Sequence, residues 1–262
     1  MNLFFQKTGQ GPPIVILHGL FGSSDNWISM ARKLAATFTV YLVDQRNHGH
    51  SPHSETNTYQ NMVDDLDELL KRLDLHRIHL VGHSMGGKTA MLYGAKHPEI
   101  INTLTIIDIA PDGYVNNTIT TSRIPSNQDI INAMARIDLP MVGSRTEVDK
   151  ILTVPIPDPV VRQFIMKNLH RNADNSFTWK INLKALLNAL PGIMGPITEF
   201  ISESFPVLFI KSEISAYLSE KHLTAVKSYF PKAKIFVIPG AGHWIHADQP
   251  ELLLHALLEF CS

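Results

Sequence analysis

A serine between two glycines is the residue of this 262-residue chain whose setting most favours covalent chemistry. Ser84 stands in Gly82-His83-Ser84-Met85-Gly86, a G-x-S-x-G pattern that follows an apolar, strand-like run and precedes a helical one. The glycines leave room for a sharp turn that pushes the serine hydroxyl out of a sheet. The pattern alone also fits a glycine-rich turn whose serine caps the helix, so the nucleophile hypothesis needs partner residues.

A second motif, near the N-terminus, could stabilise an oxyanion. Residues 18–22, His-Gly-Leu-Phe-Gly, follow the first long apolar run, where an oxyanion-hole loop belongs. The backbone N–H groups of Leu20 and Met85 would form the hole. We also expect Phe21 and His83 to line the substrate pocket.

A third motif provides a general base. Residues 240–243, Gly-Ala-Gly-His, directly follow the last strand-like run. The glycines would let the chain turn back over the sheet, so that the His243 imidazole reaches Ser84. The chain order nucleophile, acid, histidine is then the order of α/β-hydrolases.

The serine segment also satisfies a phosphate-binding pattern. Residues 82–89 read G-x4-G-K-T, and Asp108 ends the next strand-like run, as a Mg²⁺-binding aspartate would. However, at least two strands precede this loop, the aspartate follows immediately after the next helix, and the motifs at 18–22 and 240–243 would be unexplained. We therefore reject a nucleotide site and interpret Lys88 as an ordinary residue of the helix behind the serine.

The elements that must position these residues alternate along the chain. Short apolar runs predict buried strands at residues 14–17, 39–43, 77–81, 103–107, 206–210 and 235–238. Helical patterns lie between them, at residues 25–36, 58–73, 85–97, 217–229 and 249–260. In the second helix we expect the acidic residues to face solvent, namely Asp64, Asp65, Asp67 and Glu68. The alternation predicts an α/β fold with a mostly parallel, doubly wound sheet, and Leu3-Phe4-Phe5 predicts an antiparallel edge hairpin.

One long stretch breaks this alternation. Residues 112–203 contain helical fragments separated by prolines, and they are too many for a connecting loop. We expect a helical cap inserted into an α/β core formed by residues 1–111 and 204–262. The cap has similar numbers of acidic and basic residues and no basic cluster that would mark a phosphate site.

Taken together, these motifs resemble α/β-hydrolases of the small YbfF-type esterase group. The resemblance rests on the serine turn, His18-Gly19, residues 44–52 (Asp-Gln-Arg-Asn-His-Gly-His-Ser-Pro) and residues 240–247. It covers nearly all of the chain outside the cap. It implies hydrolysis of small acyl esters or acyl-CoA thioesters through an acyl-enzyme, without a cofactor.

The acid of the triad departs from the usual pattern. Ser215 falls where most such hydrolases carry an aspartate, and a serine cannot stabilise an imidazolium electrostatically. Because the ends of neighbouring parallel strands meet at one sheet edge, Asp108 is our candidate acid, with Glu213 as the alternative. The resemblance implies Asp108 as well. We expect Ser215 to support the acid and the base by hydrogen bonding.

Composition excludes several other classes. Lys and Arg number 23 and Asp and Glu 24, so a net charge of −1 gives no reason to expect nucleic acid or an anionic membrane as partner. No apolar run approaches the ~18 residues of a membrane span, and no signal peptide is visible, so we expect a cytoplasmic protein. The single cysteine, Cys261, is not a nucleophile candidate. His48, His50 and His53 lack metal-ligand spacing, so we expect no metal.

The nucleophile also narrows the reaction. A serine at position 84 argues against dehalogenases and epoxide hydrolases, which form an ester with an aspartate. Carbon–carbon bond hydrolysis and perhydrolysis use the same triad, and some proteins of this fold are ligand-binding receptors with little turnover. These remain alternatives to ester hydrolysis.

Overall fold

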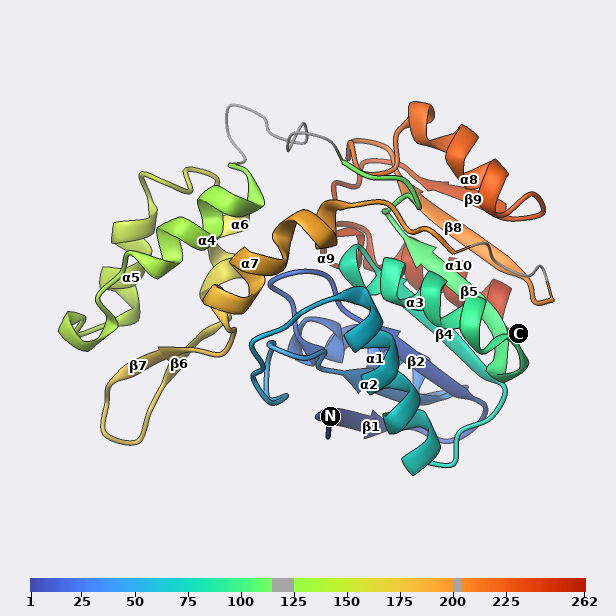
Figure 1. Ribbon diagram of the computed structural model, residues 1–262, viewed down its shortest axis with the longest axis horizontal. Coiled ribbons are helices and arrows are strands. Elements are labelled where there is room, and N and C mark those ends of the chain that lie inside the picture. Colours follow the sequence, from blue (N-terminus) through green and yellow to red (C-terminus); the bar gives the residue numbers. More distant parts are fainter. Residues whose placement is uncertain (115–124, 200–203) are drawn as a thin grey trace.

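A seven-stranded sheet forms the centre of the computed structural model, which describes residues 1–114, 125–199 and 204–262 (Figure 1). The strand order is β1-β3-β2-β4-β5-β8-β9, and only β1 (Phe5–Thr8) runs antiparallel to its neighbour. The parallel strands are β2 (Pro13–Leu17), β3 (Thr39–Val43), β4 (Ile78–His83), β5 (Ile101–Ile107), β8 (Val207–Ser212) and β9 (Lys234–Ile238). The predicted α/β fold with a mostly parallel sheet is confirmed.

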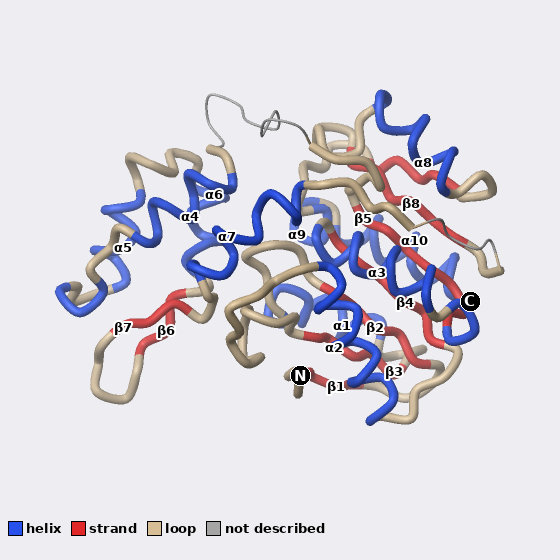
Figure 2. The backbone as a smooth tube through the Cα atoms, in the orientation of Figure 1, coloured by secondary structure: helices blue, strands red, loops and turns tan. Residues whose placement is uncertain are grey.

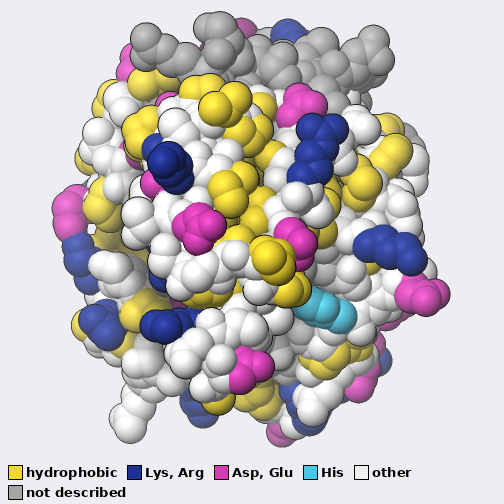
Figure 3. All heavy atoms as spheres, turned by 90° about the vertical axis from the view of Figure 1, so that its left-hand side faces the viewer, with side chains coloured by type: hydrophobic (Ala, Val, Ile, Leu, Met, Phe, Trp, Pro, Cys, Tyr) yellow, Lys and Arg dark blue, Asp and Glu magenta, His cyan; other side chains and the backbone are white. Residues whose placement is uncertain are grey.

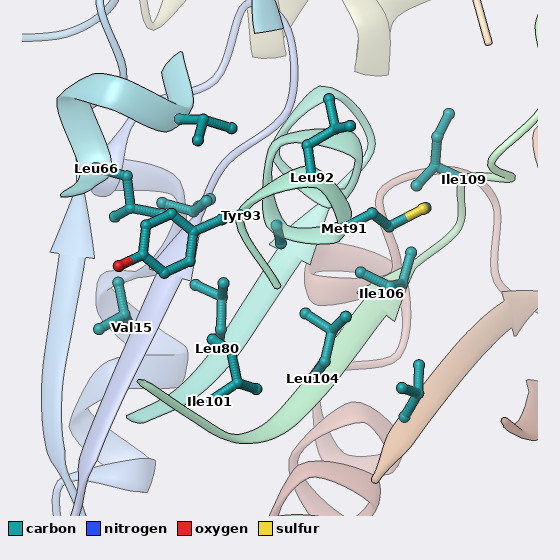
Figure 4. Close-up of a cluster of buried hydrophobic side chains, with 14 of the residues drawn as sticks. Val15, Leu66, Leu80, Met91, Leu92, Tyr93, Ile101, Leu104, Ile106 and Ile109 are labelled. Carbon is teal, nitrogen blue, oxygen red and sulfur yellow. The ribbon is translucent and has the colours of Figure 1, made fainter. Parts of the chain in front are cut away.

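Helices cover both faces of this sheet. One face packs against α2 (Tyr59–Arg72), α3 (Met85–Lys96) and α8 (Leu223–Tyr229), and the other against α1 (Ile28–Leu34), α9 (Ile245–Asp248) and α10 (Pro250–Cys261). Successive strand side chains point to opposite faces, so Val15 joins the first core and Ile16 the second. Figure 4 shows Val15 and Leu80 of the sheet facing Leu66 and Tyr93 of the covering helices.

Three sequence expectations need correction. The first strand pairs with β3 and not with the strand that follows it, so it is an antiparallel edge strand but not half of a hairpin. The helix expected over residues 217–229 begins only at Leu223, after a single 3-10 turn at Glu220–His222, and Tyr217 lies in the loop before that turn. Asp65 is buried, not solvated, and accepts hydrogen bonds of 2.6 and 2.9 Å from the Arg46 guanidinium.

The long stretch between β5 and β8 forms a group of elements to one side of the sheet, called the cap below (Figure 1). Its described elements are α4 (Asn127–Ala135), α5 (Arg145–Leu152), α6 (Pro159–Met166), β6 (Leu169–Arg171), β7 (Phe177–Trp179) and α7 (Leu183–Met194). They share a hydrophobic cluster distinct from the two sheet cores. The cap is not entirely helical, because β6 and β7 pair as an antiparallel hairpin (Figure 2).

Two chain segments connect the cap to the sheet, and they lie side by side. The Tyr114 amide donates to the Met194 carbonyl and the Ile197 amide to the Pro111 carbonyl, both at 2.8 Å. We call this paired crossing the neck. In the part of the chain that the structure describes, no helix combines the length and the apolar character needed to cross a membrane.

Candidate active site

Ser84 lies on a strained turn between β4 and α3. Its backbone has φ 52° and ψ −119°, a region that residues other than glycine rarely adopt. The flanking glycines are required by crowding. A Cβ at Gly82 would lie 2.3 Å from the Gly86 carbonyl oxygen, and one at Gly86 would lie 2.6 Å from the Leu17 carbonyl oxygen. The turn therefore holds the Ser84 hydroxyl above the carboxyl end of the sheet.

The structure brings Ser84, His243 and Asp108 into one hydrogen-bonded line. His243 Nε2 lies 3.1 Å from Ser84 Oγ, and His243 Nδ1 lies 2.7 Å from Asp108 Oδ2. Asp108 follows the end of β5 and is fully buried, whereas His243 follows β9 and is 17% exposed. Glu213, the alternative acid, is exposed, and its carboxylate accepts from the Gly240 amide at 2.8 Å. Of the two candidate acids, it is Asp108 that contacts the imidazole.

The serines after β8 are arranged differently from the expectation. Among the described residues Ser215 makes no hydrogen bond to Asp108 or His243. The Ser212 amide instead donates to Asp108 Oδ1 at 3.2 Å, and Ser212 Oγ accepts from the Ser215 amide at 2.9 Å. Sequence reasoning missed Ser212, although its place at the end of the strand next to β5 was a usable signal.

Two backbone donors lie near the nucleophile, since Met85 directly follows Ser84 and Leu20 lines the same cavity as Ser84. The loop at residues 18–22 packs directly on the nucleophile, since a Cβ at Gly19 would lie 3.0 Å from Ser84 Cβ. The amides of Leu20 and Met85 donate to no acceptor among the described residues. This is what an oxyanion hole requires before substrate binds.

His18 holds this loop in place. Its Nε2 accepts from the Gln45 amide at 3.0 Å, while the Gln45 side chain donates to the His18 carbonyl at 2.7 Å. Burial lowers the pKa of His18 to about 4, so the ring stays neutral and can accept. The conspicuous histidine of this motif is thus a structural support for the Leu20 amide.

His83 packs beside the general base. Its Nε2 donates to the His243 carbonyl at 2.8 Å, and the two ring centroids are 4.8 Å apart. Burial holds the pKa of His83 well below its usual range, and the proximity of His243 lowers it further. A neutral His83 does not add a second positive charge next to His243.

A cavity of about 380 Å³ opens over Ser84 and His243. Loops of the sheet domain contribute Leu20, Phe21 and His83, as the sequence predicted for the latter two. The cap and the loop after β8 contribute mostly apolar side chains, namely Ile130, Val160, Val161, Phe164, Ile165, Met194, Ile214 and Tyr217. Two carboxylates, Asp158 and Asp248, also line the cavity. Figure 3 shows apolar side chains among charges of both signs at the cap end of the molecule.

Lys88 is not the ordinary helix residue that the sequence suggested. It is fully buried, and its ammonium donates to the carbonyls of Asp112 (2.8 Å) and Gly195, one on each segment of the neck. Burial lowers its pKa to about 7. The lysine of the phosphate-binding pattern therefore hydrogen bonds to the neck. The aspartate of that pattern, Asp108, hydrogen bonds to His243.

The closely spaced histidines also have separate partners. His48 is buried and its Nδ1 hydrogen bonds with the Arg46 carbonyl at 2.8 Å, His50 packs on the Phe4 ring, and His53 contacts the Lys180 carbonyl. No group of three or more His, Cys, Asp or Glu side chains able to hold a metal occurs within the described ranges.

Comparison with known proteins places the chain in a family. Residues 12–250 match the model of the α/β hydrolase fold family. The chain is 38% identical over 257 residues (96% of this chain, 81% of the relative) to the mouse sn-1-specific diacylglycerol lipase ABHD11. It is 34% identical to a putative esterase/lipase of Haemophilus influenzae (98% and 85% covered) and 32% identical to esterase YbfF of Escherichia coli (98% and 96% covered).

Comparison with a solved structure supports the same family. A marine microorganism esterase superposes with a TM-score of 0.93 at 43% identity, covering 98% of each chain. The chain belongs to the α/β-hydrolase family, and the resemblance to the YbfF-type group is confirmed. It is an enzyme of the serine hydrolase class.

Proposed function

We propose that this enzyme is a carboxylesterase that cleaves small acyl esters through an acyl-enzyme on Ser84. The observation that carries the proposal is the hydrogen-bonded line from Ser84 through His243 to Asp108 beneath an apolar cavity. We further propose that residues 112–203 act as the cap of a core made of residues 1–111 and 204–262, with the substrate held between them.

The reaction follows from this geometry. His243 Nε2 takes the proton of Ser84 Oγ as that oxygen attacks the ester carbonyl, and the oxyanion is bound by the amides of Leu20 and Met85. The imidazolium then gives its proton to the leaving alkoxide, which departs as an alcohol. A water molecule, deprotonated by His243, attacks the acyl-enzyme, and the acid leaves as Ser84 recovers its proton. Asp108 keeps Nδ1 protonated and stabilises the transient imidazolium.

The cavity supports an uncharged substrate with an apolar acyl group. Its lining is mostly aliphatic and aromatic, and the carboxylates of Asp158 and Asp248 would repel an anionic substrate. The relatives named esterase/lipase and diacylglycerol lipase fit neutral esters. An acyl-CoA thioester would react by the same steps, but its phosphates would have to lie away from these two carboxylates, so we propose neutral esters as the better substrates. Rates on p-nitrophenyl and CoA esters of matched chain length would rank the two.

Replacing the nucleophile tests the proposal directly. We expect Ser84→Ala to lower kcat on a short p-nitrophenyl ester by about 10⁴–10⁶-fold, because the acyl-enzyme forms on the Ser84 oxygen that this change removes. A fluorophosphonate probe should label the wild-type enzyme and not this variant, while the far-ultraviolet circular dichroism should stay unchanged. Retained esterase activity in Ser84→Ala would exclude Ser84 as nucleophile.

A further inference from the structure

The ring of Tyr217 lies flat on the His243 imidazole, although no step above uses it. The two ring centroids are 4.0 Å apart and the planes are inclined by 23°. Tyr217 belongs to the loop between β8 and α8, where the sequence had predicted helix. Because Tyr217 covers only the face of the imidazole, the two nitrogens of His243 can still hydrogen bond in the ring plane with Ser84 and Asp108.

Two backbone hydrogen bonds and a contact with the cap hold Tyr217 in this position. Its carbonyl accepts from the Tyr114 hydroxyl at 2.6 Å, and its amide donates to Ser215 Oγ at 3.2 Å. Asn127, in the first turn of α4 in the cap, lies beside the Tyr217 hydroxyl, and both residues line the cavity over Ser84. Tyr217 therefore contacts the general base with its ring, the neck with its backbone and the cap with its hydroxyl.

His83 approaches the imidazole as well. Its ring lies 4.8 Å from the His243 ring at an inclination of 41°, and it fixes the His243 backbone carbonyl. With Tyr217 stacked on the ring and His83 packed beside it, tilting out of the Ser84–Asp108 line requires displacing an aromatic side chain. Burial raises the pKa of Tyr217 to about 12, so the phenol stays neutral throughout the working range of the enzyme.

We propose that Tyr217 is a positioning residue for the general base, which couples the orientation of His243 to the docking of the cap. The inference rests on the proposed esterase function. The face of an aromatic ring carries negative potential, so the stacked Tyr217 stabilises the imidazolium that His243 becomes in each half-reaction. The kcat for ester hydrolysis should then depend on the ring, and KM on the contact between the Tyr217 hydroxyl and Asn127 of α4.

Two substitutions at one position separate these roles. Tyr217→Leu removes the ring, and we expect kcat on a p-nitrophenyl ester to fall about tenfold, equivalent to about 1.4 kcal/mol. Tyr217→Phe keeps the ring and loses the Asn127 contact, so kcat should stay within about twofold while KM rises. Asn127→Ala, which removes the same contact from the cap side, should reproduce the KM change of Tyr217→Phe.

Equal kcat values for Tyr217→Leu and wild type would overturn the proposal, as would an equal loss of kcat in Tyr217→Phe and Tyr217→Leu. If the leucine variant does not fold, NMR of the wild-type enzyme decides. The stacked ring should shift the carbon-bound imidazole protons of His243 upfield of a free histidine, and an unshifted resonance overturns the stacking. The proposed esterase function itself fails only if the wild type is inactive or Ser84→Ala is active, so the two failures are distinguishable.

Discussion

Asp108 is unusual among the polar residues of the site because its backbone and its carboxylate are both constrained. It has φ 49° and no exposed surface, and its two oxygens accept from His243 Nδ1 and from the Ser212 amide. The first of these bonds selects the tautomer whose Nε2 can accept the proton of Ser84. The second prevents the carboxylate from rotating away.

Exchanging this carboxylate for an amide should therefore strongly reduce the catalytic rate. We expect Asp108→Asn to lower kcat about 10³–10⁴-fold, because the amide favours the tautomer with a proton on Nε2. Ser215→Ala removes only the acceptor for the Tyr217 amide, so its kcat should fall far less than that of Asp108→Asn. Glu213→Gln is the matched control and should keep wild-type kinetics. Comparable losses in Glu213→Gln and Asp108→Asn would reverse the choice of acid.

At the residue scale, the sequence predicted the functional residues that belong to recognisable motifs. It missed residues that reach the site only because the fold brings distant segments together. Ser84, His243 and the 18–22 loop are recognisable because their chemistry needs glycines at fixed spacing. Ser212 contributes a backbone amide, which every residue type except proline has, so its identity carries almost no signal. The sequence predicts Tyr217 as the first residue of a helix. Its contact with His243 joins residues 26 positions apart, one after β8 and the other after the neighbouring strand β9.

The turn from β4 into α3 is the element whose geometry matters most, because it presents the nucleophile and one oxyanion donor together. Its glycines allow the start of α3 to touch the end of β2. Gly86 has the backbone oxygens of Leu17 and His18 where a Cβ would be, both at 2.6 Å, and a backbone atom cannot rotate away. The helix must shift if this position carries a side chain.

We expect Gly86→Ala to lower the free energy of unfolding by about 1–3 kcal/mol, the usual effect of overpacking. It should also lower kcat, because the shift moves the Met85 amide away from the oxyanion. Gly192→Ala in α7 is the control, since nothing lies within 4 Å of its added Cβ and alanine favours the helix by about 1 kcal/mol. Urea unfolding and esterase kinetics would measure both, and wild-type stability in Gly86→Ala would contradict the packing argument.

Elements were predictable where burial dictates their pattern. The parallel strands β2, β3, β4, β5 and β8 are apolar on both faces because helices cover both, so their runs stand out in the sequence. The edge strand β9 also has an apolar run, although Phe236 and Val237 in it are exposed. The β6–β7 hairpin has only three residues in each strand, too few to show an alternation. The partner of β1 could not be predicted either. The sequence of an exposed edge strand has too little hydrophobic pattern to distinguish pairing with β2 from pairing with β3.

At the scale of the whole molecule, the sheet domain and the cap meet at the neck, and Lys88 is buried there. It extends from α3 beneath both crossing segments, donates to one carbonyl on each, and lies 5.0 Å from the Tyr114 ring centre. Tyr114 in turn donates to the Tyr217 carbonyl. One buried amine thus joins the helix behind the nucleophile to both connections of the cap.

This burial should make stability depend on pH. Removal from water lowers the pKa of Lys88 to about 7, a shift that nearby Asp112 only partly offsets, whereas an unfolded lysine titrates near 10.4. Between these values unfolding takes up a proton, so the free energy of unfolding should rise with pH, by at most about 1.4 kcal/mol per unit. Lys88→Met should lose this rise between pH 7 and 9, whereas the exposed control Lys184→Met should keep it. Urea unfolding across this range would measure the slopes, and equal slopes for Lys88→Met and wild type would show that Lys88 stays protonated in the folded enzyme.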